Sequence, residues 1–163
     1  MNIKQQNQKT LLAKLLATED ITVIFQKVET AMFNTDTRVL IIPVFSEDYS
    51  TERLDMYITH EVGHALYTPS IKGIENELNK RPGLFNYINI VEDSRVDKLI
   101  KIKYPGVKRS YITGMKEMFE AGVFKEAVDS ANKGEVNNYA DKIFCLTRIA
   151  DFIDIKKLIL MKR

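Results

Sequence analysis

Hydrophobic positions follow two different periods along the chain, and the change between them separates a short β-rich region from a helical remainder. Between residues 21 and 43 the apolar residues are mostly β-branched or aromatic, which is typical of strands. We expect strands at Ile21–Phe25, Val28–Phe33 and Arg38–Pro43, the last two joined into a hairpin by a turn at Asn34–Thr37. From Thr51 onward the apolar residues recur at three- and four-residue intervals, which predicts helices.

A helix is also expected before the strands, over residues 5–18, with Leu11, Leu12, Leu15 and Leu16 as its buried face. The helix from Thr51 is expected to be capped by Ser50 or Thr51 and to end before Pro69. Further helices are predicted at residues 74–80, 83–102, 112–121, 124–130, 138–149 and 150–160. The expected fold class is therefore α+β, a small, mostly antiparallel sheet packed on a helical remainder, in one domain over residues 1–163.

The pentad His60-Glu61-Val62-Gly63-His64 holds both histidines of the chain. Residues i and i+4 share one face of a helix, so the two imidazoles can reach one point. Zinc binds imidazole nitrogen at about 2.0–2.1 Å and keeps a position for water when the protein supplies three ligands. Glu61 falls beside that position and can accept a proton from the water as a general base. The alternative is an ordinary amphipathic helix that carries the pentad by chance.

A third ligand has to be a carboxylate from a second helix, because no third histidine exists. In the segment Asn89–Ile100, Glu92 lies next to an apolar stripe, where a carboxylate is costly to bury unless it is paired or bound to metal. Glu92 is therefore the expected ligand, on a helix that returns antiparallel to the first. Asp93 is the competing ligand, with contact to an imidazole N–H as its expected role. A solvated charged helix is the alternative for this segment.

Four separated blocks resemble a group of predicted metallopeptidases of tailed bacteriophages, in the gluzincin division of zinc peptidases and similar in plan to thermolysin. The blocks are T-A-M-F-N-T-D-T-R-V-L-I-I-P, H-E-V-G-H-A-L-Y-T-P, N-I-V-E-D-S-R-V-D-K and K-Y-P-G-V-K-R-S-Y. The resemblance implies a zincin-like fold, zinc held by His60, His64 and Glu92, and Glu61 as the base. Chains of this group continue well beyond this length, so we expect a shortened relative, a fragment or a minimal catalytic domain.

In a thermolysin-like plan an edge strand lies along the cleft above the metal helix, and an extended peptide can add to that edge by main-chain hydrogen bonds. The alternative is that the hairpin merely covers the helices. A substrate carbonyl also needs a partner for its developing oxyanion. Tyr111 is our first choice, beside a small basic cluster, with Tyr104, Arg109 and Tyr67 as further options. A tyrosine that only packs its ring is the alternative.

Composition excludes several function classes. The net charge of +2 is too small to argue for nucleic-acid or membrane binding. The single cysteine, Cys145, excludes an internal disulfide and fits a reducing compartment, so we expect a cytoplasmic protein, in the host cytoplasm if of phage origin. The expected function is zinc-dependent hydrolysis of peptide or protein substrates. The alternative is a catalytically silent zinc-binding or metal-free interaction module of the same fold, with a protein partner still unidentified.

Overall fold

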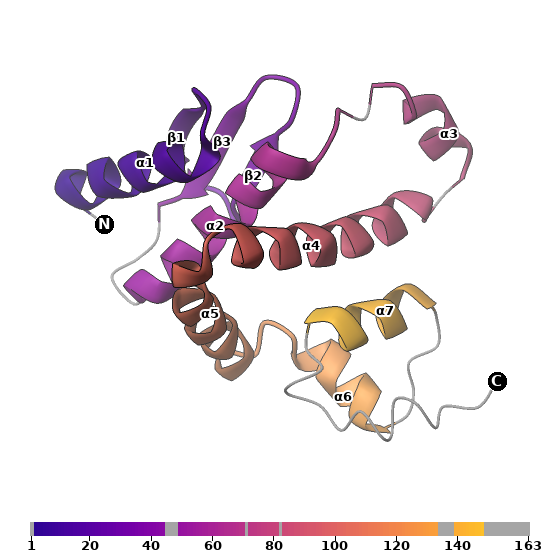
Figure 1. Ribbon diagram of the computed structural model, residues 1–163. Coiled ribbons are helices and arrows are strands. Elements are labelled where there is room, and N and C mark those ends of the chain that lie inside the picture. Colours follow the sequence, from indigo (N-terminus) through magenta and orange to yellow (C-terminus); the bar gives the residue numbers. More distant parts are fainter. Residues whose placement is uncertain (1, 45–48, 71, 82, 134–138, 149–163) are drawn as a thin grey trace. The chain divides into compact units, whose positions relative to one another are not determined.

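The computed structural model describes residues 2–44, 49–70, 72–81, 83–133 and 139–148 (Figure 1). Contacts within the chain divide it into two compact units, Met1–Gly73 with Arg95–Lys116, and Ile74–Ser94 with Glu117–Arg163. Helix α4 (Leu84–Lys103) contributes to both units without interruption. The single domain expected over residues 1–163 therefore stays a prediction. The described residues form an α+β fold that is mostly helical.

The sheet of the first unit has three strands, β1 (Thr22–Gln26), β2 (Met32–Asn34) and β3 (Val39–Pro43), in the order β1-β3-β2. The expected hairpin is confirmed, because β2 and β3 pair in antiparallel fashion. The sheet as a whole is mixed and not mostly antiparallel, since β1 pairs with β3 in parallel along its whole length. This arrangement arises because β3 inserts between the two earlier strands, a long-range choice that local periodicity does not specify.

Helix α1 (Ile3–Ala17) begins at Asn2, whose side chain forms a reciprocal capping box with Gln5. Its fully buried residues are Ala13 and Ala17, while Leu16 is partly buried. The expected burial of Leu11 and Leu15 is wrong, because these side chains are 59% and 67% exposed. Leu11 and Leu15 each lie two positions before a buried alanine, which corresponds to about 200° of helical rotation. Their side chains therefore point away from the face formed by the alanines.

Helix α2 (Thr51–Tyr67) carries the pentad and packs on the sheet (Figure 1). The side chain of Ser50 accepts a hydrogen bond from the Arg53 N–H, which confirms the expected cap. The apolar face of α2 joins the core of the first unit, which consists of Ala13, Ala17, Ile21, Leu40, Ile42, Leu54, Ile58, Val62 and Ile100. This burial fixes the rotation of α2 and therefore the direction in which its opposite, polar residues point.

The remaining helix of the first unit follows a sharp break after α4. A 3₁₀ turn, η1 (Pro105–Val107), leads into α5 (Lys108–Glu120), which starts four residues before the predicted position. Gly114 lets α5 approach α2 closely, because a Cβ there would lie 2.8 Å from Met56 Cβ and 3.0 Å from Arg53 Cα. Helix α5 therefore lies against α2.

The second unit contains α3 (Glu75–Lys80), α6 (Lys125–Lys133) and α7 (Tyr139–Arg148), close to the predicted helices at 74–80, 124–130 and 138–149. Helices α6 and α7 share a small core of Ala131 and the buried Cys145, flanked by Phe124, Ala127, Val128 and Phe144. The helix predicted at 150–160 lies outside the described residues. In the described part of the chain, every helix is too short or too polar to cross a membrane.

Candidate metal centre

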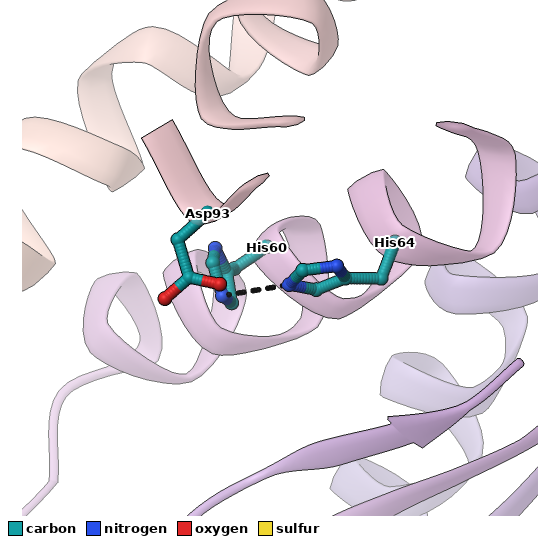
Figure 2. A group of neighbouring side chains, drawn as sticks. All are labelled: His60, His64 and Asp93. Atoms are coloured by element: carbon teal, nitrogen blue, oxygen red, sulfur yellow. Dashed lines mark hydrogen bonds between the residues drawn. The ribbon is translucent and has the colours of Figure 1, made fainter. Parts of the chain in front are cut away.

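The two histidines of α2 face each other at their Nε2 atoms, which lie 3.3 Å apart (Figure 2). Their ring centroids are 4.8 Å apart and the ring planes are nearly perpendicular, at 89°. Both rings are partly buried, whereas Glu61 and Val62 between them are buried. The helix therefore brings the two imidazoles together as the i, i+4 spacing predicts.

Each imidazole has its other nitrogen occupied by a partner. His60 Nδ1 lies 2.7 Å from Asp97 Oδ1, and the Asp97 side chain is only 8% exposed. His64 Nδ1 lies 2.9 Å from Thr68 Oγ1. An ionised carboxylate only accepts, so His60 donates from Nδ1 and keeps a lone pair on Nε2. When the Thr68 hydroxyl accepts in the same way, His64 also keeps its lone pair on Nε2, and the two lone pairs then point at the same space.

The second helix of the site runs antiparallel to α2, as predicted. Asp97 of α4 lies opposite His60, and Val96 lies opposite Gly63, one turn further along α2. A Cβ at Gly63 would be 3.2 Å from Val96 Cβ, so the small residue allows the close approach of α4. Two further side chains of α4 contact α2: Asp97 contacts His60, and Arg95 Nη2 donates to the carbonyl of Tyr67 at 2.6 Å.

The carboxylate grouped with the two imidazoles is that of Asp93. One ligand atom each from His60, His64 and Asp93 lie within 4.8 Å of one another, and all three residues are partly buried (Figure 2). Asp93 precedes Asp97 by one turn of the same helix. With about 100° per residue, Asp93 lies within about 15° of the centre of the face formed by the buried residues Val96, Asp97 and Ile100.

Glu92, the ligand expected from sequence, is half-buried on α4. The same rotation places it nearly 90° from the centre of that buried face, by about 100° per residue. Among the described residues, the metal-ligand grouping includes Asp93 and not Glu92. The sequence alone could not decide which of these two neighbours is the metal ligand, because the answer depends on which residues of α4 face α2.

Glu61, the expected general base, directly follows His60 in the sequence and is 7% exposed, so its side chain is buried. A carboxylate so placed has an environment of low dielectric constant, in which interactions with charge are strong.

The residues considered for oxyanion stabilisation have other contacts. Tyr111 is buried on α5, and the Lys101 Nζ lies 4.3 Å from the centre of its ring. The Tyr104 hydroxyl donates to the Leu16 carbonyl at 2.8 Å and so joins α1 to the core. Arg109 is exposed, and Tyr67 is partly buried at the end of α2. An oxyanion role for Tyr111 stays a prediction.

The sequence did not predict Thr68 as the partner of His64. The available signal was its position four residues after His64, which places both on one face of the helix end. The sequence also did not predict the contacts made by Arg38, whose Nη2 donates to the Ala65 carbonyl at 2.5 Å. Arg38 is distant in sequence, so only the packing of the hairpin against α2 reveals this contact.

Comparisons of the chain with models of known protein families, with curated proteins and with solved structures each give no match. The case for a function therefore depends on the chemistry of the chain's own residues.

Proposed function

We propose that this chain is a zinc-dependent peptidase in which His60, His64 and Asp93 hold the metal and Glu61 is the general base. The observation that carries the proposal is the pair of Nε2 atoms 3.3 Å apart, with both Nδ1 atoms engaged on the outer side. Two lone pairs in that arrangement repel each other unless one nitrogen donates a proton to the other or both bind one cation. Two nitrogens bound to one zinc in tetrahedral geometry at about 2.05 Å are separated by about 3.3 Å.

The donor set also fits zinc. Two imidazole nitrogens and one carboxylate oxygen form the set typical of catalytic zinc sites, which leave one position for water. Structural zinc sites are usually closed by four ligands, often with cysteine. The lone Cys145 belongs to the core of the second unit. We therefore favour a catalytic site over a structural one, with Asp93 as third ligand and Glu92 as the alternative.

The metal supplies, when bound, a Lewis acid that lowers the pKa of a water molecule toward about 7. Glu61 would accept a proton from that water and return it to the leaving amine, as a general base and then a general acid. Asp97 and Thr68 contact the Nδ1 atoms of the two imidazoles, where partners that accept would hold both rings in the tautomer that offers Nε2. A purely structural zinc site does not require a general base. The buried carboxylate of Glu61 therefore favours an enzyme over a silent module.

The substrate class that suits the fold is an extended peptide. Strand β2 is at the edge of the sheet and contacts α2, the helix of the metal centre. An edge strand offers main-chain N–H and C=O groups to which a peptide can add as a further strand. We propose in addition that this chain is related to the phage metallopeptidases that its four sequence blocks resemble.

The test compares the parent with Glu61→Gln, which keeps the size of the side chain but accepts no proton. Zinc-loaded protein is incubated with a denatured protein mixture, and cleavage is followed by mass spectrometry of the new termini. We expect cleavage by the parent and a loss of about 10²–10⁴-fold in the variant, the usual contribution of general acid–base catalysis. Firm zinc binding without cleavage by the parent would instead support the silent interaction module. As a matched control, Glu77→Gln changes an exposed glutamate of α3 and should leave cleavage unchanged.

A further inference from the structure

We infer that the turn between β2 and β3 is a positioning element for the metal centre, acting on His64 through the last turn of α2 and Thr68. The inference rests on the proposed zinc site and adds residues that sequence did not connect with it. Asp36 and Arg38 belong to the turn, and both contact the segment that follows His64.

The first contact is made by Arg38. Its Nη2 donates to the Ala65 carbonyl at 2.5 Å and also pairs with Glu19, while its guanidinium carbon lies 4.8 Å from the centre of the Phe33 ring. The residue has a left-handed backbone, with φ of 56°. Such a conformation is strained for a residue other than glycine. The contacts of the side chain offset this strain, which links the shape of the turn to the end of α2.

The second contact is made by Asp36. The Ser70 hydroxyl donates to Asp36 Oδ1 at 2.6 Å, and the Lys72 ammonium lies 3.7 Å from Asp36 Oδ2. The Asn34 side chain holds the turn itself, because its Oδ1 accepts the N–H groups of Asp36 and Thr37 at 3.0 and 2.8 Å. One short turn therefore holds the chain on both sides of Thr68.

Thr68 passes this restraint to the metal ligand. Its N–H donates to the His64 carbonyl at 3.0 Å, and its Oγ1 lies 2.9 Å from His64 Nδ1. His60 is oriented in a different way, by Asp97 of α4. In the contacts described, His60 is thus held from α4, and His64 is held from the segment that the β2–β3 turn contacts.

The expected effect is on zinc affinity, because loss of the partner of a ligating histidine typically weakens metal binding about 10–100-fold. Thr68→Val should show that loss, and Thr68→Ser, which keeps the hydroxyl, should retain parental affinity. Arg38→Ala and Asp36→Ala should each weaken zinc binding about 3–10-fold, less than loss of the direct partner. In the Thr68→Val background the Arg38→Ala effect should be much smaller, because the two residues act in series.

The experiment is a zinc titration against a chromophoric chelator with the full chain, together with thermal unfolding of the metal-free proteins. Matched controls are Thr147→Val, Arg81→Ala and Asp20→Ala, at exposed positions that take no part in the contacts described for Thr68, Arg38 and Asp36, and these variants should bind zinc as the parent does. Side-chain ¹⁵N spectra of His64 provide a second readout, since Thr68→Val should populate both tautomers of the metal-free imidazole. A variant that melts with the parent yet binds zinc more weakly supports the inference.

Parental zinc affinity in folded Thr68→Val and Arg38→Ala proteins, with a single His64 tautomer, would overturn the positioning role while leaving the zinc site intact. Unchanged zinc binding in His64→Ala would instead overturn the proposed function itself. Parental affinity in Thr68→Val together with weakened affinity in Arg38→Ala would also contradict the inference, because the restraint would then not pass through Thr68.

Discussion

The contact between Gly63 and Val96 determines how closely the two helices of the metal centre approach, and a graded set of glycine substitutions tests it. Gly63→Ala adds a Cβ that lies 3.2 Å from Val96 Cβ and 3.5 Å from the Val96 carbonyl oxygen. That spacing is tighter than an ordinary contact, so the backbone of α4 must move by a few tenths of an ångström. A well-packed core resists such insertions by about 1–3 kcal/mol.

Helix propensity acts in the opposite direction, because alanine is favoured over glycine by about 1 kcal/mol inside a helix. The net expectation from these terms is a loss of about 0–2 kcal/mol in the free energy of unfolding. Gly114→Ala should be more destabilising, because its Cβ would meet Met56 Cβ at 2.8 Å and the Arg53 Cα at 3.0 Å. Gly106→Ala is the control, since its Cβ would have no neighbour within 4 Å in the described structure.

The assay is urea unfolding of the metal-free proteins, followed by zinc titration of each. We expect stability to fall in the order Gly106→Ala, Gly63→Ala, Gly114→Ala. Zinc affinity should fall in Gly63→Ala, because movement of α4 carries Asp97 and Asp93 away from the imidazoles. A Gly63→Ala protein that gains about 1 kcal/mol of stability and binds zinc as the parent does would refute the close packing of α2 and α4.

Three further predictions concern the third metal ligand, the partner of His60 and the exposed face of α1. Asp93→Asn should weaken zinc binding by at least about tenfold while Glu92→Gln leaves it near the parental value, and the reverse order in a zinc titration would restore Glu92 as the ligand. Asp97→Asn should weaken zinc about 10–100-fold without loss of secondary structure by circular dichroism, and parental affinity there would contradict its role in orienting His60. Leu15→Gln should change the free energy of unfolding by no more than about 0.5 kcal/mol, since this side chain is 67% exposed, and a loss above about 2 kcal/mol in urea unfolding would mean that it is buried.

Local features of the chain could be predicted because their signals lie within a few residues. The Ser50 cap, the i, i+4 spacing of His60 and His64, and the stop before Pro69 define α2 almost to the residue. The β2–β3 hairpin could be predicted for the same reason, since the Asn34 side chain closes its turn locally. The helix predicted at residues 83–102, which carries Glu92 and Asp93, also agrees with α4 to within one residue at each end.

The features of the fold and of the site that could not be predicted from the sequence depend on contacts between distant segments. Four leucines and two alanines of α1 all fit a helical period, and only packing selects Ala13 and Ala17 for burial. The parallel pairing of β1 with β3 is likewise a choice among distant partners. Glu92 and Asp93 are neighbours, so their roles separate only when Asp97 is seen against His60. Arg38 contacts the end of α2 from the hairpin turn, and no local sequence pattern predicts that contact.

The central claim is that His60 and His64 hold one zinc ion. The most direct measurement is the zinc content of the full chain after removal of metal, reloading and dialysis, in the parent and in His64→Ala. We predict one zinc per chain in the parent and none retained in His64→Ala. A parent that retains no zinc, or a His64→Ala protein that retains as much as the parent, would contradict the claim.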